Sequence, residues 1–406
     1  MVPSWREMWA VFGRIGLVSF GGPAAQIAVM QEALVDRLGW LDRDAFLRGL
    51  GFCTLLPGPE AMQLAIYAGW RVRGVPGGLL AGLLFVLPGA VVMMGLSAAY
   101  VAYGRVAWVE AAFVGVKAAV LAVVLAALWR LRTRVAVGPT SLAVAAAAFV
   151  ALFFLGLPFW AVIGGALLVG LVRRASGPAV EVPVARHSTG RTVLIGVAAW
   201  WLPLLAVIAL APGSPPAEAA VFFSWLATVS FGGAYALLAA LAQGAVEGYG
   251  WLAPEAMIDG LGLAETTPGP LVLVTVFAGW LGGAATGSAF ATASVTLWAT
   301  FAPCFLWVFA GAPHLERLSA MPRLRGALDT VTAAVAGVIA NLSVWFALHV
   351  LFREVEGVRP ALASLDMRAL VLAVVAAACL WSGRVGLIAT LAVCAGLGAA
   401  WFALAG

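Results

Sequence analysis

Apolar runs separated by short polar loops make up most of the chain. Residues 74–104 contain no charged side chain, and residues 135–172 contain none over 38 positions, although Gly156-Leu157-Pro158 divides the second run. A helix needs about 20 apolar residues to cross a bilayer. The pattern therefore predicts an all-α polytopic membrane protein with about thirteen transmembrane helices. We expect them near 8–29, 45–70, 76–101 and 106–129, as two in 135–172, near 192–211, 217–244 and 256–281, as one from Gly283 to Pro313, and near 326–352, 369–383 and 385–406.

Composition and charge also indicate a membrane location. Of the 406 residues, 64% are hydrophobic and 10% are charged, whereas a soluble domain carries about 25% charged residues. In a membrane protein, the net charge of +5 reflects the arginines of the loops rather than a surface that binds nucleic acid. We therefore expect a lipid bilayer and no nucleic acid as partner. With thirteen helices, Arg6 and four arginine-rich loops lie on one side, which the positive-inside rule assigns to the cytoplasm. This places the N-terminus inside and the C-terminus outside. The loops contain Arg71 and Arg73; Arg130, Arg132 and Arg134; Arg173, Arg174, Arg186 and Arg191; and Arg317, Arg323 and Arg325.

Cysteine and histidine residues give no pattern of a metal or cofactor site. Cys53, Cys304, Cys379 and Cys394 stand in apolar runs without a Cys-x-x-Cys pair, and the three histidines are far apart. The sequence contains no redox centre, cofactor motif or catalytic dyad. We therefore expect no metal, no cofactor and no enzymatic activity.

The two halves of the chain repeat each other. Residues 18–59 align with 229–270 without a gap, at an offset of 211, and eighteen of the forty-two pairs are identical. Farther along the chain the offset becomes 215, where residues 116–120 match residues 331–335. Self-similarity over this length predicts two homologous structural units.

The number of helices in each unit predicts how the units are oriented. Six helices in each half and a lone helix near 192–211 place the second half in the opposite orientation to the first. We divide the chain into a first repeat at 1–175, a linker with one helix at 176–215 and a second repeat at 216–406. Inverted repeats are typical of secondary transporters, whose sites lie near the midplane. If 45–70 and 256–281 were re-entrant hairpins, however, the halves would be parallel.

Glycine and proline segments at matched positions predict breaks in the helices. Pro57-Gly58-Pro59 and Pro268-Gly269-Pro270 interrupt their helices, because proline lacks a backbone donor and clashes with the preceding turn. The freed backbone groups must face protein or a water-filled cavity. Helices that restart there point free N–H groups at the cavity, which suits an anion. Ser19-Phe20-Gly21-Gly22 and Ser230-Phe231-Gly232-Gly233 add glycines for close backbone approach. The alternative is that all four segments are packing kinks.

Charged side chains inside predicted helices are further candidates for substrate binding or proton coupling. Lys117 lies near the middle of its helix, where it either holds an anion or pairs with a carboxylate. Glu60 and Glu265 flank the two Pro-Gly-Pro breaks and are candidates for proton coupling, because a carboxyl group buried away from water binds a proton more readily. Their alternative is pairing with Lys117 or Arg48. Three charged residues lie near predicted helix ends, where snorkelling to the interface explains them: Asp259, Arg14 and Arg48.

Hydroxyl and amide side chains near the breaks complete the candidate site. They donate hydrogen bonds either to an oxyanion or to backbone carbonyls of their own helices. They are Ser19, Ser230, Thr54, Thr266, Thr267, Gln26 and Gln63. The predicted substrate site consists of Ser19, Gly21, Gly22, Gln26, Pro57, Gly58, Pro59, Lys117, Ser230, Gly232, Gly233, Thr266, Thr267, Pro268, Gly269 and Pro270.

At these motifs the chain resembles the chromate ion transporter (CHR) family in its long bidomain form. The likeness lies in Ser19-Phe20-Gly21-Gly22-Pro23, Gly39-Trp40-Leu41, Leu56-Pro57-Gly58-Pro59 and their second-half copies, including Ala264-Glu265-Thr266-Thr267-Pro268-Gly269-Pro270. The resemblance implies an inner-membrane protein that exports chromate through two homologous halves of opposite orientation. Chromate is similar to sulfate, since both are tetrahedral dianions. The halves differ where Ala234 stands for Pro23 and where Leu237 and Val274 stand for Gln26 and Gln63, so they would contribute unequally to a substrate site.

The membrane potential gives an exporter its driving force. Each negative charge that leaves a cell with a negative interior gains about 2.3 kcal/mol per 100 mV. We therefore expect an exporter of chromate or a related oxyanion, driven by the membrane potential, with proton antiport as an additional drive. The alternative is a proton-coupled importer of sulfate or a related oxyanion. Small residues at 282–289 suit tight helix packing, either within the chain or in a homodimer.

Overall fold

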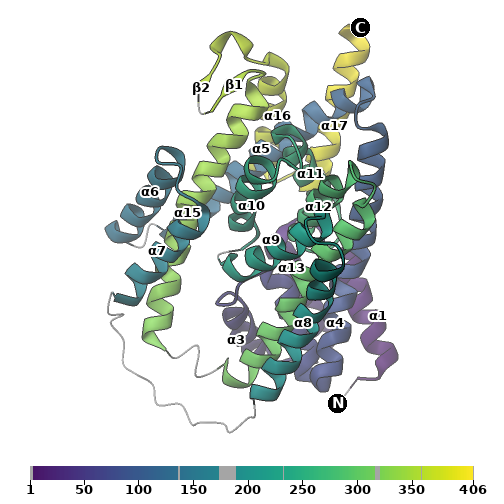
Figure 1. Cartoon of the computed structure of the whole chain (residues 1–406), viewed down its shortest axis with the longest axis vertical. Helices are drawn as coiled ribbons and strands as arrows, with labels where there is room; N and C mark the ends of the chain where they lie inside the picture. The colour runs from purple at the N-terminus through teal and green to yellow at the C-terminus, as the bar shows by residue number, and fades with distance from the viewer. Residues whose placement is uncertain are drawn as a thin grey trace.

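The computed structural model is almost entirely helical. It describes residues 3–135, 138–172, 189–231, 233–315, 321–357 and 359–405. Figure 1 shows a bundle of helices with the N- and C-termini at opposite ends of its long axis. Within the described residues, the strands are a two-residue pair, β1 (Val355–Glu356) and β2 (Arg359–Pro360), in a loop beside α16. The structure is therefore all-α, as predicted.

The two halves contain matching series of helices. The first half consists of α1 (Trp5–Val18), α2 (Gly22–Gln31) with the π-helical η1 (Glu32–Arg37), α3 (Arg43–Cys53), α4 (Glu60–Tyr103), α5 (Ala107–Val135), α6 (Pro139–Phe153) and α7 (Phe159–Val172). The second consists of α9 (Pro215–Val229), α10 (Ala234–Leu241) with the π-helical η2 (Ala242–Gly248), α11 (Pro254–Thr266), η3 (Leu271–Leu273), α12 (Val274–Ala284), α13 (Ala289–Gly311) with η4 (Ala312–His314), α15 (Pro322–Leu351), η5 (Leu362–Ser364), α16 (Met367–Ser382) and α17 (Leu387–Ala405). Helix α8 (Thr189–Leu210) lies between them, and the linker residues 173–188 lie outside the described part.

Helix α4 consists of two arms that fold back on each other. Arg73 and Gly74 leave the helical conformation, and Gly74 has φ 64°, which favours glycine. The first arm (60–72) packs on the second arm (75–103) so closely that a β-carbon on Gly69 would collide with the carbonyl oxygen of Gly77. The arms are the counterparts of α12 and α13, which are separate helices in the second half.

Each half begins with four short helices in place of two predicted long ones. The predicted helix near 8–29 is divided into α1 and α2, and that near 217–244 into α9 and α10. The helices near 45–70 and 256–281 are interrupted as the Pro-Gly-Pro segments predict. The pieces then fold back: Gly49 of α3 lies against the Tyr67 ring of α4, and Gly260 of α11 against the Phe277 ring of α12. These segments are helical hairpins: the structure has the predicted breaks at the Pro-Gly-Pro segments and a further break at each Ser-Phe-Gly-Gly segment.

The two halves interlock rather than standing side by side. Helix α5 of the first half packs against α16 and α17 of the second, and α15 of the second packs against α6 and α7 of the first. Glycines permit the close approach: Gly115 lies against the Cys394 backbone, and Gly337 against that of Ala145. Neither half therefore buries its long helix without the other.

The second arm of α4 and its counterpart α13 lie side by side and antiparallel. Gly78 faces Phe309, and Gly82, one turn later on α4, faces Phe305, one turn earlier on α13. A rotation that exchanges the halves therefore reverses the direction of these helices.

Six helices in the described part are long and apolar enough to cross a bilayer: α4, α5, α8, α13, α15 and α17. Large apolar side chains such as Leu83, Leu87 and Val91 are exposed on the second arm of α4, as lipid-facing positions require. The small residues at 282–283 pack within the chain, Gly282 on Trp251 and Gly283 on Thr292. Packing within the chain thus explains why small residues stand at these two positions.

Candidate functional site

The four broken segments of the two halves meet in the middle of the molecule. The Gly58 N–H donates to the Ser230 carbonyl at 3.0 Å, and the Gly269 N–H donates to the Ser19 carbonyl at 2.9 Å. Because proline has no N–H, this glycine supplies the one backbone donor of each Pro-Gly-Pro segment. Each half thus gives that donor to the Ser-Phe-Gly-Gly segment of the other. We call residues 19–22, 57–59, 230–233 and 267–270 the crossing; Gly232 lies outside the described residues.

The glycines of the crossing adopt conformations that other residues avoid. Gly21 and Gly22 have φ near 82° and 81°, and Gly58 and Gly269 have φ 111° and 93°. Positive φ values cost non-glycine residues about 1–3 kcal/mol. The sequence folds into breaks here because glycine tolerates the turn and proline stops the preceding helix.

Two amides from the first half brace the crossing. Gln26 Nε2 donates to the Gly269 carbonyl at 2.7 Å and to the Ser19 carbonyl at 3.4 Å. Gln63 Nε2 donates to the Pro57 carbonyl at 2.7 Å. Both side chains are buried, and among the described residues neither Oε1 atom has a hydrogen-bond partner. Burying a polar atom without a partner is unfavourable, so these oxygens mark places where a further polar group would stabilise the structure.

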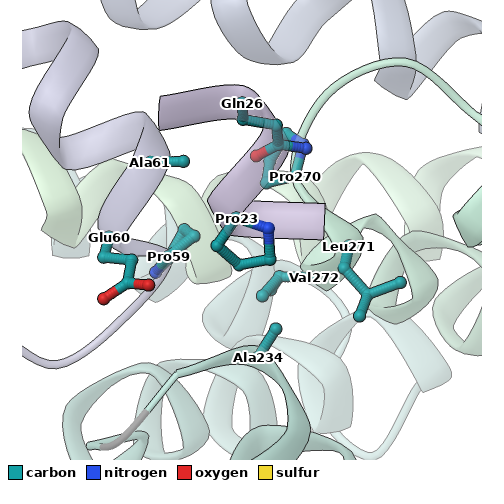
Figure 2. Close-up of a pocket in the computed structure, with 9 residues that line it drawn as sticks. All are labelled: Pro23, Gln26, Pro59, Glu60, Ala61, Ala234, Pro270, Leu271 and Val272. Carbon is teal, nitrogen blue, oxygen red and sulfur yellow. The ribbon is translucent and has the colours of Figure 1, made fainter. Parts of the chain in front are cut away.

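A small cavity lies between the two halves. Figure 2 shows the nine residues around it. Eight of them form four pairs of equivalent positions in the two repeats: Pro23 with Ala234, Pro59 with Pro270, Glu60 with Leu271 and Ala61 with Val272; the ninth is Gln26. The cavity volume is about 10 Å³, roughly one water molecule. A tetrahedral oxyanion has five heavy atoms, so the crossing must open to admit one.

Four helix N-termini point at this cavity. Its lining includes first-turn residues of α2, α4, α10 and η3, the last of which continues into α12. The N-cap residues Gly21, Pro59, Gly233 and Pro270 make no side-chain capping bond to these helices. Each N-terminus carries the equivalent of about +0.5 elementary charge. The helix ends therefore contribute positive potential to the cavity, and the carboxylate of Glu60, the one charged side chain in its lining, opposes it.

The predicted hydroxyl side chains bond within their own helices. Ser19 Oγ donates to the Ile15 carbonyl at 2.6 Å, and Ser230 Oγ lies 3.4 Å from the Ala227 carbonyl. The hydroxyls of Thr266 and Thr267 both donate to Leu263, each at 2.8 Å, and that of Thr54 donates to Gly51. The backbone of these segments, rather than their hydroxyls, forms the crossing.

The three predicted ionisable residues lie in three different places. Glu60 lines the cavity at its edge, on the far side from Leu271 (Figure 2). Glu265 is 2% exposed and accepts a hydrogen bond of 3.1 Å from the Tyr235 hydroxyl. Lys117 is half-buried on α5 and is not part of the cavity lining. The structure therefore separates Lys117 from the crossing.

Asp259 is buried, whereas the sequence predicted that its side chain reaches the membrane interface. It is 5% exposed and accepts a hydrogen bond of 2.8 Å from the Tyr100 hydroxyl, whereas Arg14 and Arg48 are exposed. Snorkelling to the interface therefore does not describe Asp259. Its partner lies 159 residues away in the other half, and no local pattern in the sequence reports such a contact.

A tight contact joins the second arm of α4 to the second break. A β-carbon on Gly89 would collide with the Pro268 carbonyl oxygen. At the equivalent place in the other half, Cys304 of α13 lies against Gly58. The helices beside the crossing thus contact it directly.

Comparisons with known proteins agree with the motifs at the crossing. The family model described as "Chromate transporter" matches residues 6–171 and 217–399. The probable chromate transport protein of Synechococcus elongatus is 30% identical over 83% of this chain and 83% of its own length. The chromate transport protein of Pseudomonas aeruginosa is 31% identical over 84% and 80%, and that of Cupriavidus metallidurans is 30% identical over 83% and 81%. No solved structure matches the chain. With both halves matched, the chain belongs to the chromate transporter family.

Proposed function

We propose that this protein is a secondary transporter that exports chromate or a similar tetrahedral oxyanion across the cytoplasmic membrane. The observation that supports this most is the convergence of four helix N-termini on one cavity between the repeats. Four ends of about +0.5 each sum to about +2, and a charged Glu60 in the lining reduces this to about +1. The cavity has no lysine or arginine in its lining, so the positive ends of the helices, rather than a basic side chain, would attract the anion.

The arrangement of equivalent helices supports inverted repeats. The second arm of α4 and its counterpart α13 are antiparallel neighbours. A twofold axis that relates two antiparallel membrane-spanning helices lies in the membrane plane, as in other transporters with inverted halves. The termini at opposite ends of the molecule fit a cytoplasmic N-terminus and an external C-terminus (Figure 1).

Hairpins at the start of each half leave this orientation unchanged. If both the α1–α2 and the α3–α4 hairpins are re-entrant, each half has two fewer membrane-spanning segments. The number of such segments per half then stays even. In alternating access, the crossing would then open first to one side of the membrane and afterwards to the other. The Gly58–Ser230 and Gly269–Ser19 bonds would open in turn.

The driving force for export is the membrane potential. Two negative charges moving outward gain about 4.6 kcal/mol per 100 mV, which corresponds to a concentration ratio of about a thousand or more. The anion needs no further energy source to leave the cell.

A proton-coupled importer is the second candidate, because two carboxylates of α11, Asp259 and Glu265, are buried. Import of a dianion runs against the membrane potential and requires coupling to an inward flow of protons. Buried carboxylates are the groups that carry protons in such carriers.

The test is uptake of labelled chromate and, separately, labelled sulfate into inverted membrane vesicles. Accumulation that depends on a membrane potential of the physiological direction, and collapses when an ionophore removes it, supports the exporter. Sulfate uptake into proteoliposomes that appears only with an inward proton gradient supports the importer. Vesicles with the protein that equal empty-vector vesicles for both anions and both gradients would overturn the proposal.

A further inference from the structure

The polar side chains in the lining of the central cavity come from the first half only. They are Gln26 of α2 and Glu60 of α4, and the equivalent positions in the second half are Leu237 and Leu271. Both leucines are buried. The cavity is thus built from equivalent backbone segments of the two halves, whereas its polar side chains are unequal.

The amide of Gln26 is held in one orientation. Its Nε2 atom donates to the Gly269 carbonyl at 2.7 Å and to the Ser19 carbonyl at 3.4 Å. A half-turn of the amide would place its oxygen against these two carbonyl oxygens, which have no hydrogen to donate. In Figure 2 the amide nitrogen lies beside Pro270, and the oxygen lies on the opposite side, toward Glu60. The oxygen is therefore the atom that Gln26 turns toward the other lining residues.

This oxygen is a buried acceptor that lacks a donor. Gln26 is 1% exposed, and its Oε1 atom has no hydrogen-bond partner in the part of the chain that the structure describes. A buried acceptor without a partner is unfavourable. The other eight lining side chains are apolar or, for a charged Glu60, an acceptor only. A ligand with an O–H group of its own would therefore supply the donor that these side chains do not.

The charge of the cavity favours the same kind of ligand. The four helix N-termini contribute about +2, and a charged Glu60 lowers this to about +1. A dianion without a proton exceeds this charge and brings only acceptors to the Gln26 oxygen. A tetrahedral monoanion with one O–H matches the charge and keeps three oxygens for the N–H groups of the helix ends.

We propose that Gln26 makes the crossing selective for the monoprotonated form of a tetrahedral oxyanion, such as hydrogen chromate, which donates its O–H to Gln26 Oε1. This inference rests on the proposed oxyanion transport and specifies the form of the anion that is carried. The proton arrives on the anion and leaves with it, so no bond to hydrogen is made or broken in the protein. One negative charge moves outward per anion, and the membrane potential still favours export.

Opening of the crossing on one side leaves the Gln26 amide in place. Gln26 is bonded where the Gly269 N–H meets the Ser19 carbonyl, whereas the other bond between the halves joins Gly58 to Ser230. When the Gly58–Ser230 bond opens to admit the anion, the partners of Gln26 Nε2 stay together. The Oε1 atom then remains directed at the entering anion.

Sulfate is the reference anion, because it has the same shape as chromate and carries no O–H from mildly acidic to alkaline pH. It would leave Oε1 without a donor, and one unpaired buried polar atom lowers affinity by about 10- to 100-fold. Sites that bond to a hydroxyl of their substrate reject analogues without that hydroxyl for the same reason.

Glu60 is the titratable side chain in the lining, so its own charge must be separated from that of the anion. On α4 the next titratable side chain is Tyr67, two turns farther along, and Tyr235 of α10 donates to Glu265. The helices α1 and η1, which pack on α2, carry exposed charges at Arg6, Glu7, Arg14, Glu32, Asp36 and Arg37. A change in any of these charges acts on sulfate and chromate alike, so sulfate measured over the same pH range reports it.

The test is displacement of labelled chromate from the purified full chain in detergent, at a mildly acidic pH where phosphate is mainly a monoanion with O–H groups. We expect phosphate to compete at least about tenfold more strongly than sulfate. Perchlorate, a tetrahedral monoanion without an O–H, should also compete at least about tenfold less strongly than phosphate. As pH rises and hydrogen chromate loses its proton, the affinity for chromate should fall by up to about tenfold per pH unit relative to that for sulfate.

Variants of Gln26 separate selection from a structural role. Gln26→Lys keeps donors for the Gly269 and Ser19 carbonyls but has no acceptor, so it should bind sulfate more tightly than the wild type and lose the preference for phosphate. Gln26→Leu lacks both groups and should also lose this preference. Gln63→Leu is the matched control, because it removes a buried amide whose Oε1 atom likewise lacks a partner among the described residues but which does not line the cavity. It should keep the wild-type ratio of phosphate to sulfate affinity.

Equal competition by phosphate and sulfate, or by phosphate and perchlorate, in the wild type would overturn this inference and leave the transport proposal standing. A wild-type ratio in both Gln26 variants would also overturn it, since a purely structural role lowers the affinity for all anions together. Failure of the wild type to bind or transport chromate at any pH would instead overturn the transport proposal itself.

Discussion

Substituting Gly89 by alanine tests whether the second arm of α4 holds the second break in place. The new β-carbon would collide with the Pro268 carbonyl oxygen and would also lie 2.6 Å from Leu273 Cδ1. The hydrogen bond from the Gly269 N–H to the Ser19 carbonyl restrains the backbone of the break. The helix and the crossing must separate instead.

The size of the effect follows from the cost of overpacking, which is about 1–3 kcal/mol for an added methyl group in a well-packed site. At about 1.4 kcal/mol per tenfold change, a cost of 2 kcal/mol lowers the population of the closed crossing about thirtyfold. In the proposed alternating-access mechanism, every transport cycle passes through this conformation. We therefore expect the initial rate of chromate uptake by inverted vesicles to fall by about 10- to 100-fold at equal protein level.

Gly95→Ala is the matched control, because it lies on the same arm of α4 with no atom within 4 Å of the position of a β-carbon. It should keep the wild-type rate and apparent unfolding temperature. If Gly89→Ala transports as fast as Gly95→Ala, the contact between α4 and the second break is not part of the working structure.

Two further substitutions have defined outcomes. Gln26→Leu places the second-half residue in the first half and leaves the Gly269 carbonyl without the donor that Gln26 supplies. The substitution should lower the stability of the fold by about 1–3 kcal/mol, measured as a lower apparent unfolding temperature of the purified protein. An unchanged unfolding temperature would contradict the role of Gln26 in stabilising the crossing. In the loop before α16, burial raises the pKa of Asp366, but the hydrogen bond from Arg353 at 2.8 Å and the bonds from two backbone amides outweigh it and hold this pKa below its usual value. A lowered pKa stabilises the fold above the unfolded-state pKa, and this stabilisation is lost as pH falls through the folded-state pKa. Arg353→Ala should therefore be less stable than the wild type at neutral pH, by about 0–1 kcal/mol because Arg353 is largely exposed, and as stable as the wild type in strong acid. An equal loss of stability at both pH values would contradict the ion pair as the cause of that loss.

The central motifs of the site could be predicted from the sequence because they rest on the covalent properties of glycine and proline. Pro57-Gly58-Pro59 has one backbone donor, and a buried donor requires a partner. The repeat also indicated that the breaks occur in pairs. The identity of those partners, such as the Ser230 carbonyl, could not be predicted, because it depends on how the halves interlock.

Side-chain roles were harder to predict than backbone breaks. A serine in a membrane helix can bond to a ligand but more often bonds to its own backbone, and Ser19 does the latter. Asp259 stood near a predicted helix end because the helix was expected to begin near residue 256, and α11 does begin nearby, at Pro254. Its burial depends on Tyr100, and such long-range contacts leave no periodic signal along the chain.

The most direct measurement is the accumulation of labelled chromate by proteoliposomes that contain the purified protein, under a membrane potential set by a potassium gradient and valinomycin. Helix N-termini around one cavity should bind the anion, and accumulation should rise with the size of an inside-positive potential and reverse with its sign. Gly89→Ala should accumulate little and Gly95→Ala as much as wild type. Uptake that equals protein-free liposomes at every potential would contradict the assignment of the crossing as an oxyanion pathway.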